Sequence, residues 1–417
     1  MKHVPKFLLL LLIAVCFIFA SKPEKLNRVP SSYSDVQVSL QSNYYGLVHL
    51  ALAAAAYIDG GDTSKMALDF KNKIDSLAVL PNPQNGAILD SASWHLEWGP
   101  AFSAQNANLV YVATCGPINN PYLRVISLRG TDTSADTLGI LKQLEEDFRA
   151  FGQKDWFKYL NSLPKNQNPY NQKVASKQTA LVANGTLEGL TKILSLVPKS
   201  NAASPGTTLI QHLYKVQPKL TVPLVVTGHS LGAALAQAVS SYLAWQMAGA
   251  FTSANQTACG LIFPNVFAPP TIGDTTFVRL YDTIFPYNYF YYNNSDIVPY
   301  GFVNVKGVEA LWGTYTDSVT TGKGAPCPGK LVNLVNLLAP QVPNYARPSN
   351  NQYGFTASYL GDTTAMNKFL ANVFPSKEKQ INPTSWLAQL IWQHFPPCYY
   401  HYISKISGVN SYPPFIQ

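Results

Sequence analysis

Between residues 107 and 296 the chain alternates short apolar runs with segments whose apolar residues recur at helical spacing. Two β-rich runs, ANLVYVATC and YLRVISLRG, flank the breaker GPINNP and predict a hairpin. The continuous apolar run VPLVVT predicts a strand covered on both faces. A helical pattern from Leu231 to Trp245 follows, and CGLIFPNVFAP and YNYFYYNNSD predict two further strands. This alternation predicts an α/β fold with a mostly parallel central sheet and helices on both faces.

Three further segments have a helical pattern: YYGLVHLALAAAAYI, TLEGLTKILSLV and TTLIQHLYKV. We interpret His49 and His212, which lie within them, as structural residues. From about residue 312 to 385 Pro, Gly, Asn and Thr dominate, and only KLVNLVNLL and AMNKFLANVF look helical. We therefore predict a single domain over residues 43–417, with a long insertion at about 312–385.

The N-terminal 20 residues have the pattern of a secretory signal peptide. Lys2 and Lys6 precede an apolar run that is shorter than the roughly 20 residues of a membrane anchor, and Ala20 offers a small residue for cleavage. A lipoprotein signal at Cys16 is disfavoured because Val15 stands where a small residue is expected. We expect a secreted or periplasmic protein, with residues 21–42 as a loose leader.

The formal net charge of +8 would fall to +6 after cleavage, because residues 1–20 hold two lysines and no acid. The positive residues are scattered, so we expect no nucleic-acid partner, while transient contact with an anionic membrane surface stays open. Four cysteines would remain, and an even number in an exported chain suggests disulfides. We predict a Cys327–Cys398 pair, which would tie the insertion to the C-terminal segment. The cysteine and histidine spacing predicts no metal site.

The stretch VVTGHSLGAALAQ places Ser230 between Gly228 and Gly232, after the apolar run and before the predicted helix. Gly-x-Ser-x-Gly at such a junction is the pattern of a nucleophile elbow, in which a strained turn presents a serine hydroxyl. The N–H groups at the start of the helix would face an oxyanion formed there. A glycine-rich turn with a capping serine is the alternative, but the order of the elements favours a nucleophile.

A serine becomes a nucleophile when a histidine removes its proton and a carboxylate orients that histidine. The chain order in this arrangement is serine, acid, histidine. Asp296, just beyond an aromatic-rich predicted strand, is the candidate acid, and the two histidines that follow it, His394 and His401, are the candidate bases. For the oxyanion hole we expect the backbone N–H of Leu231 and a donor from Thr131, after an earlier strand.

Four ordered stretches, SLRGTDT, VTGHSLGAALA, FAPPTIGDTTF and NNSDIVPY, resemble the fungal-type triacylglycerol lipases, the class three lipases. The resemblance covers roughly residues 43–406. It implies an α/β-hydrolase fold, no cofactor, and hydrolysis of carboxylic esters, typically those of glycerolipids. By matching position it implies that Ser230 is the nucleophile, Asp296 the triad acid and Thr131 the oxyanion-hole residue.

The resemblance also implies a helical lid after the oxyanion-hole residue, followed by an aspartate that supports it. Asp147 would be that aspartate, and SADTLGILKQLEEDF has the pattern of an amphipathic helix. An ordinary core helix is the alternative reading. The apolar stripe of the predicted lid contains Leu138, Leu141, Leu144 and Phe148.

Two features depart from the family pattern. Pro270 and Thr271 stand around the position where the family usually has arginine, so a local ion pair is expected to be missing. The span from the acid to the histidines is much longer than usual, which leaves the roof of the substrate site undetermined.

Many family members have a tyrosine five residues after the histidine, and His394 with Tyr399 has this spacing. Pro396 would begin the last helix, because proline is tolerated at the first helical position. That arrangement leaves His394 on the preceding loop and puts His401 inside the helix. We favour His394 as the base and keep His401 as the alternative.

The leading interpretation is a secreted serine esterase that hydrolyses lipid esters at a lipid–water interface and acts as a monomer. Triacylglycerol lipase leads, with phospholipase A1 and a small-ester or feruloyl esterase as alternatives. A peptidase or thioesterase on the same scaffold is less favoured. A non-catalytic lipid- or surface-binding protein is the hypothesis from a different class, and it would be expected to lack a triad member.

Overall fold

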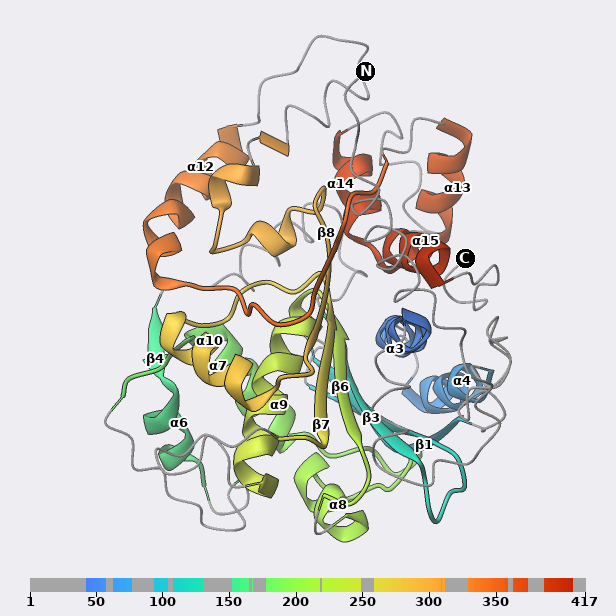
Figure 1. Ribbon diagram of the computed structural model, residues 1–417. Coiled ribbons are helices and arrows are strands. Elements are labelled where there is room, and N and C mark those ends of the chain that lie inside the picture. The colour runs from blue at the N-terminus through green and yellow to red at the C-terminus, as the bar shows by residue number, and fades with distance from the viewer. Residues whose placement is uncertain are drawn as a thin grey trace, which may run out of the picture.

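The computed structural model describes residues 43–57, 63–76, 94–103, 108–130, 152–164, 167, 178–217, 220–248, 259–308, 310–311, 329–358, 363–373 and 386–407. Their central element is a seven-stranded sheet with the strand order β1-β2-β3-β6-β7-β8-β9 (Figure 1). The predicted signal peptide and leader lie outside these residues.

The sheet is mostly parallel, as predicted. β1 and β2 pair in antiparallel fashion, as do β2 and β3, and the remaining strands run parallel from β3 to β9. The predicted hairpin is therefore confirmed as β2–β3. The strand bounds are β1 Trp94–Phe102, β2 Leu109–Cys115, β3 Leu123–Leu128, β6 Leu224–His229, β7 Ile262–Phe267, β8 Tyr289–Asn293 and β9 Gln352–Phe355. A separate pair joins β4 (Gln153–Asp155) to β5 (Leu181–Ala183).

Helices cover both faces of the sheet (Figure 1). One face carries α3 (Asn43–Ala55), α4 (Thr63–Ser76) and α15 (Pro396–Ser407). The other carries α6 (Trp156–Ser162), α7 (Asn184–Ser195), α9 (Leu231–Ala248) and α10 (Thr275–Ile284), while α8 (Leu209–Val216) lies near the lower end of the sheet in the view.

The central strand β6 shows why the sequence has a continuous apolar run there. Leu224 and Val226 belong to the apolar core shared with α7 and α9, whereas Val225 belongs to the core shared with α3 and α15. All six residues of β6 are buried. Because side chains alternate across a strand, a strand covered on both faces needs apolar residues at successive positions. The prediction for this segment is confirmed.

Two strands at opposite edges of the sheet were not predicted. β1 contains Glu97, Gly99 and Pro100 and pairs with β2 through two irregularities in register, so its sequence lacks a regular alternation. β9 is only four residues long and lies within the segment interpreted as an insertion. It extends the sheet beside β8, so this segment contributes to the central sheet itself.

Much of the rest of the described part of that segment is helical. The two helices expected there are α12 (Gly329–Leu338) and α13 (Thr363–Val373), and α12 is followed by the 3₁₀ helix η5 (Ala339–Asn344). Near α12, the segment after η4 (Val298–Tyr300) forms a small apolar cluster with η5 and β5. Its buried members are Ala183, Phe302, Val305, Val308, Val335 and Tyr345.

The predicted Cys327–Cys398 disulfide is wrong, because Cys398 is a thiol in this structure. It lies in the first turn of α15 and is fully buried. Burial and the nearby negative charge of Asp296 raise the pKa of this thiol well above its ordinary value. Cys327 lies outside the described residues.

None of the described helices is long and apolar enough to cross a membrane.

A buried ionic network lies between β1, β3 and α8. Arg124 donates from Nε to Glu97 Oε2 at 3.0 Å and from a terminal nitrogen to Gln217 Oε1 at 2.8 Å. His212 Nε2 lies 3.4 Å from the same Glu97 oxygen. Burial alone would raise the pKa of Glu97, but hydrogen bonds and positive charge from His212 and Arg124 lower it below its ordinary value of 4.5. The interpretation of His212 as structural agrees with this contact.

Arg124→Met is expected to lower the free energy of unfolding by about 3–5 kcal/mol at pH 7, because it leaves the Glu97 carboxylate enclosed without its cation. Since the folded pKa of Glu97 is depressed, its contribution is present above about pH 4.5 and is lost as the pH falls further. Urea unfolding at pH 7 and at pH 4 measures both effects. Lys215→Met, at an exposed position on α8, is the control. Equal losses in the two variants would contradict the prediction.

Candidate active site

Ser230 occupies a sharp turn between β6 and α9. Its φ of 60° lies in the left-handed region, which is unfavourable for a residue with a Cβ. A Cβ added at Gly228 would lie 2.3 Å from the Gly232 carbonyl oxygen, and one added at Gly232 would lie 2.3 Å from the Leu128 carbonyl oxygen. Both glycines are therefore required for close approach of the strand ends and the helix. The turn has the geometry predicted from the Gly-x-Ser-x-Gly pattern.

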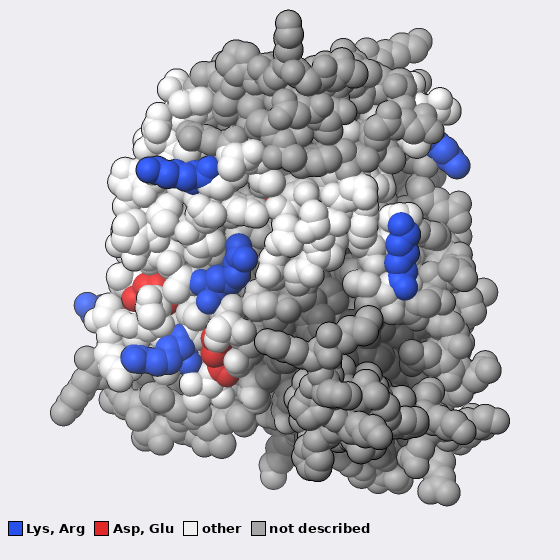
Figure 2. Space-filling model, turned by 45° about the horizontal axis from the view of Figure 1, so that its top comes forward, with Lys and Arg blue, Asp and Glu red and all other residues white. Residues whose placement is uncertain are grey.

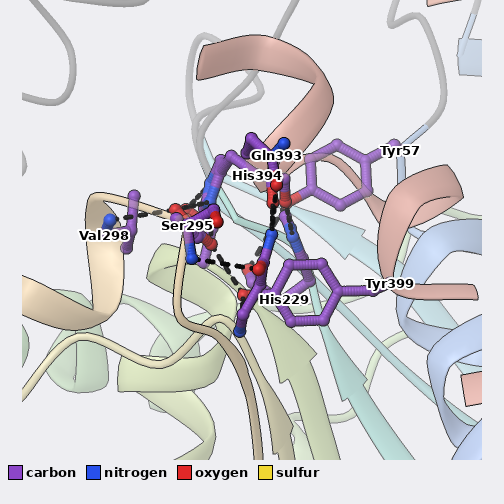
Figure 3. Close-up of polar contacts among 10 residues, drawn as sticks. Tyr57, His229, Ser295, Val298, Gln393, His394 and Tyr399 are labelled. Carbon is purple, nitrogen blue, oxygen red and sulfur yellow. Dashed lines mark hydrogen bonds and ion pairs between the residues drawn. The ribbon is translucent and has the colours of Figure 1, made fainter. Parts of the chain in front are cut away.

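The structure brings Ser230, His394 and Asp296 together at the same end of the sheet. His394 Nε2 lies 2.9 Å from Ser230 Oγ, and His394 Nδ1 lies 2.9 Å from Asp296 Oδ2 and 3.0 Å from Oδ1 (Figure 3). The exposed fraction is only 4% for Ser230, 7% for His394 and 0% for Asp296. A hydroxyl, an imidazole and a carboxylate are thus linked in series and shielded from water.

Asp296 follows β8 and accepts further hydrogen bonds that hold its carboxylate in place. The backbone N–H of Val298 donates to Oδ1 at 2.9 Å, and the Tyr399 hydroxyl donates to Oδ2 at 2.7 Å. Burial, followed by the charge of Asp296, raises the pKa of Tyr399 well above 10. Tyr399 therefore stays a neutral phenol that donates its proton, and the carboxylate is oriented toward His394.

His394 differs from prediction in its local structure. It is the last residue of α14 (Trp386–His394) and does not lie on a loop, whereas α15 begins at Pro396 as expected. His401 lies within α15, where its ring packs 5.2 Å from that of Tyr402 and 6.5 Å from that of Trp392. It is His394 that lies within hydrogen-bond distance of Ser230.

The predicted oxyanion-hole residues are only partly described. Leu231 is the first residue of α9, where backbone N–H groups have no partner within the helix. Thr131 lies beyond the described residues, but Gly130 lies beside the serine, since a Cβ added there would be 3.3 Å from Ser230 Cβ. Asp147 and the predicted lid residues Leu138, Leu141 and Leu144 also fall outside the described ranges.

Four polar residues around this site were not predicted. His229 contacts the Tyr57 hydroxyl and the carbonyl of His394, while Asn293 contacts Gln393 (Figure 3). The sequence signal for His229 and Asn293 is a polar residue at the C-terminal end of a buried strand, where parallel strands of α/β sheets place their sites. Periodicity cannot reveal which distant segment such a residue meets.

The described arrangement suits nucleophilic chemistry at a serine. Among the described residues, His, Cys, Asp and Glu side chains form no group of three or more that could hold a metal ion. The mostly parallel sheet, the strained serine turn after β6 and the acid after β8 together define a protein of the α/β-hydrolase superfamily.

Comparison of the sequence with models of known protein families gives a more specific similarity. Residues 125–305, which contain both Ser230 and Asp296, match the family model described as lipase (class 3). This segment of 181 residues, less than half of the 417-residue chain, is similar to the class 3 lipases, and the match supports a carboxylic ester hydrolase of the lipase type. No curated protein sequence matches the chain.

One solved lipase structure has a similar fold, and others match more weakly. The structure of M37 lipase superimposes with a TM-score of 0.59 at 20% sequence identity, covering 84% of this chain and 89% of that one. The lipase from Rhizopus microsporus var. chinensis matches at 16% identity and a TM-score of 0.35, over 67% of this chain and 72% of that one. Yarrowia lipolytica LIP2 lipase matches at 16% identity and a TM-score of 0.39, over 63% and 75%.

Proposed function

We propose that the protein is a secreted serine lipase that cleaves the carboxylic ester bonds of lipids through an acyl-enzyme on Ser230. The observation that carries the proposal is the series of contacts from Ser230 Oγ to His394 to the buried carboxylate of Asp296. A neutral imidazole 2.9 Å from a serine hydroxyl can accept its proton.

Acylation begins when His394 Nε2 takes the Ser230 proton as Oγ attacks the ester carbonyl carbon. The resulting tetrahedral oxyanion would be held by the Leu231 N–H and by Thr131, with Asp147 supporting the latter. His394 then returns the proton to the leaving alcohol as the ester C–O bond breaks, which leaves an acylated serine. Asp296 stabilises the imidazolium that exists between the two proton transfers.

Deacylation repeats the same steps with water as the nucleophile. His394 takes a proton from water, the hydroxide attacks the acyl carbon, and a second oxyanion forms in the same hole. Its collapse releases the carboxylic acid and returns the proton to Ser230 Oγ. The cycle consumes one water for each ester and needs only the groups already named.

Covalent labelling tests the assignment of the nucleophile. An alkyl phosphonate ester with a good leaving group is expected to inactivate the enzyme and to add one phosphonyl group, which peptide mass spectrometry should locate on Ser230. Phosphonylation of another residue with parallel loss of activity would contradict the assignment. A protein that binds the probe without covalent addition would instead be the non-catalytic binding protein.

The substrate class is proposed on the family match, and triacylglycerol is the leading substrate. A panel of esters from two to eighteen carbons, assayed below and above each solubility limit, separates this proposal from its alternatives. Rates that rise at the solubility limit for long-chain triacylglycerols would support it. Preference for the sn-1 ester of phospholipids would indicate phospholipase A1, and exclusive action on short soluble esters would indicate an esterase.

The predicted lid leads to a separate test. Leu141→Ser combined with Leu144→Ser is expected to spare hydrolysis of soluble esters and to weaken hydrolysis of emulsions, because both side chains would touch lipid when the lid opens. The ratio of rates on an emulsified and a soluble ester measures the effect. An equal loss on both substrates would indicate that the segment is a plain core helix.

We also propose that the protein acts outside the cytoplasm as a monomer whose contact with lipid surfaces is transient. The basic start and apolar run of residues 1–20 support export, and a mature N-terminus near residue 21 would be found by Edman sequencing. Among the described residues on the face seen in Figure 2, Lys and Arg side chains lie apart from one another. Such a distribution favours weak, salt-sensitive attraction to an anionic surface over nucleic-acid binding.

A further inference from the structure

The end of α14 carries backbone carbonyl groups that its own helix cannot satisfy. A helical carbonyl normally accepts from the N–H four residues later, but Pro396 and Pro397 have no N–H, so the carbonyl of Gln393 loses its helical donor. Cys398 donates its N–H to the carbonyl of Phe395 at 3.1 Å, so the carbonyl of His394 loses its helical donor as well. Two consecutive carbonyls, one of them on the candidate base, need other donors.

Buried side chains at the ends of β8 and β6, the strands on either side of β7, supply those donors. Asn293, the last residue of β8, donates from Nδ2 to the Gln393 carbonyl at 3.0 Å. His229, the last residue of β6, lies with Nε2 2.7 Å from the His394 carbonyl oxygen. These strands also lead directly to Ser230 and Asp296, so the donors come from the elements that carry the other two triad members.

The hydrogen bonds of His229 determine which nitrogen bears its proton. A carbonyl oxygen can only accept, so Nε2 must carry the proton, and Nδ1 then accepts from the Tyr57 hydroxyl at 2.9 Å. Burial, then the neighbouring His394, hold the pKa of His229 well below 6.5, so the ring is neutral. Its ring centroid lies 4.8 Å from that of His394.

We propose that His229 is a positioning residue for the base: its Nε2–H holds the carbonyl of His394 and so places the His394 imidazole between Ser230 and Asp296. The inference rests on the proposed function, because it assumes that His394 is the base. His229 itself transfers no proton and touches no reacting atom. Its contribution to rate comes from the geometry of the neighbouring residue, where a displacement of about 1 Å can cost on the order of 100-fold in rate.

The test compares three purified full-length variants with the wild type on a soluble chromogenic ester. His229→Leu removes the donor, and we expect kcat to fall about 10- to 100-fold while KM changes less than about threefold. His229→Gln offers an amide N–H near the position of Nε2, and we expect it to restore most of the lost kcat. His212→Leu removes a buried histidine near the opposite end of the sheet, and we expect it to lower the melting temperature without lowering kcat.

A spectroscopic measurement separates positioning from loss of folded protein. The His394 N–H that faces Asp296 should give a low-field proton NMR signal, which we expect to weaken or shift in His229→Leu and to persist in His229→Gln and His212→Leu. Wild-type kcat in His229→Leu would overturn the proposal, and so would a loss that scales with unfolding in all three variants. An active Ser230→Ala would instead contradict the proposed function, so the two failures are distinguishable.

Discussion

Ser230→Ala is expected to give a folded protein that has lost essentially all ester hydrolysis. The substitution removes only the hydroxyl oxygen that lies 2.9 Å from His394 Nε2. Loss of a triad member reduces kcat by about 10⁴- to 10⁶-fold, because the remaining groups act only through that nucleophile. Hydrolysis of a butyrate ester, with the melting temperature measured in parallel, checks both parts of the expectation.

Folding of this variant should be close to normal. Alanine retains the Cβ that already occupies the left-handed turn, and the backbone N–H of residue 230 keeps its 3.0 Å hydrogen bond to the Phe267 carbonyl. Ser240→Ala, a buried serine within α9 that donates to the Ala236 carbonyl, is the matched control and should retain activity. Activity of Ser230→Ala within tenfold of the wild type would end the serine-hydrolase proposal.

His394→Ala is expected to be nearly as inactive as Ser230→Ala, whereas His401→Ala should keep at least about a tenth of wild-type activity, since triad members act as a unit. The two histidines lie in different helices, His394 at the end of α14 and His401 within α15, so they do not occupy equivalent positions. His394 lies between the serine and the acid, and His401 lies in the second turn of α15 beside aromatic rings. Rates of butyrate hydrolysis by both variants measure the difference.

The rate of phosphonate labelling distinguishes the two histidine variants independently of ester hydrolysis. Phosphonate labelling of Ser230 should become very slow in His394→Ala and stay fast in His401→Ala, because only the base activates the hydroxyl. His401→Ala removes ring contacts with Tyr402 and Trp392, so a moderate drop in melting temperature is expected. The reverse pattern of activity would move the base to His401 and leave the other roles unchanged.

Local pattern was sufficient for the centre of the sheet and for the serine turn. The β6 run is apolar at successive positions because both of its faces are covered, and glycines flank Ser230 because the strand ends and the helix touch there. Both constraints restrict the residue types within one short stretch, so they are visible there, although groups from distant segments such as the Leu128 carbonyl impose them. The parallel sheet and the hairpin were likewise predicted from short apolar runs and the turn residues between them.

The parts that sequence did not reveal depend on contacts between distant segments. β9 has only four residues and is a strand because β8 offers it a partner. His394 takes its position because α14 continues as far as His394 and ends just before Phe395 and the two prolines. Periodicity alone did not indicate this helix end. The contacts of His229 and Asn293 join residues 165 and 100 positions apart, so no local pattern contains them.

The packing of α15 against α3 has a consequence for how the enzyme gains activity during folding. Tyr399, Tyr400 and Ile403 of α15 share a core with Leu47 and Leu50 of α3. The segment that follows the proposed base is therefore held in place by contacts between the two ends of the described chain. Recovery of ester hydrolysis on refolding is therefore expected to require that the first and last described helices have docked against each other.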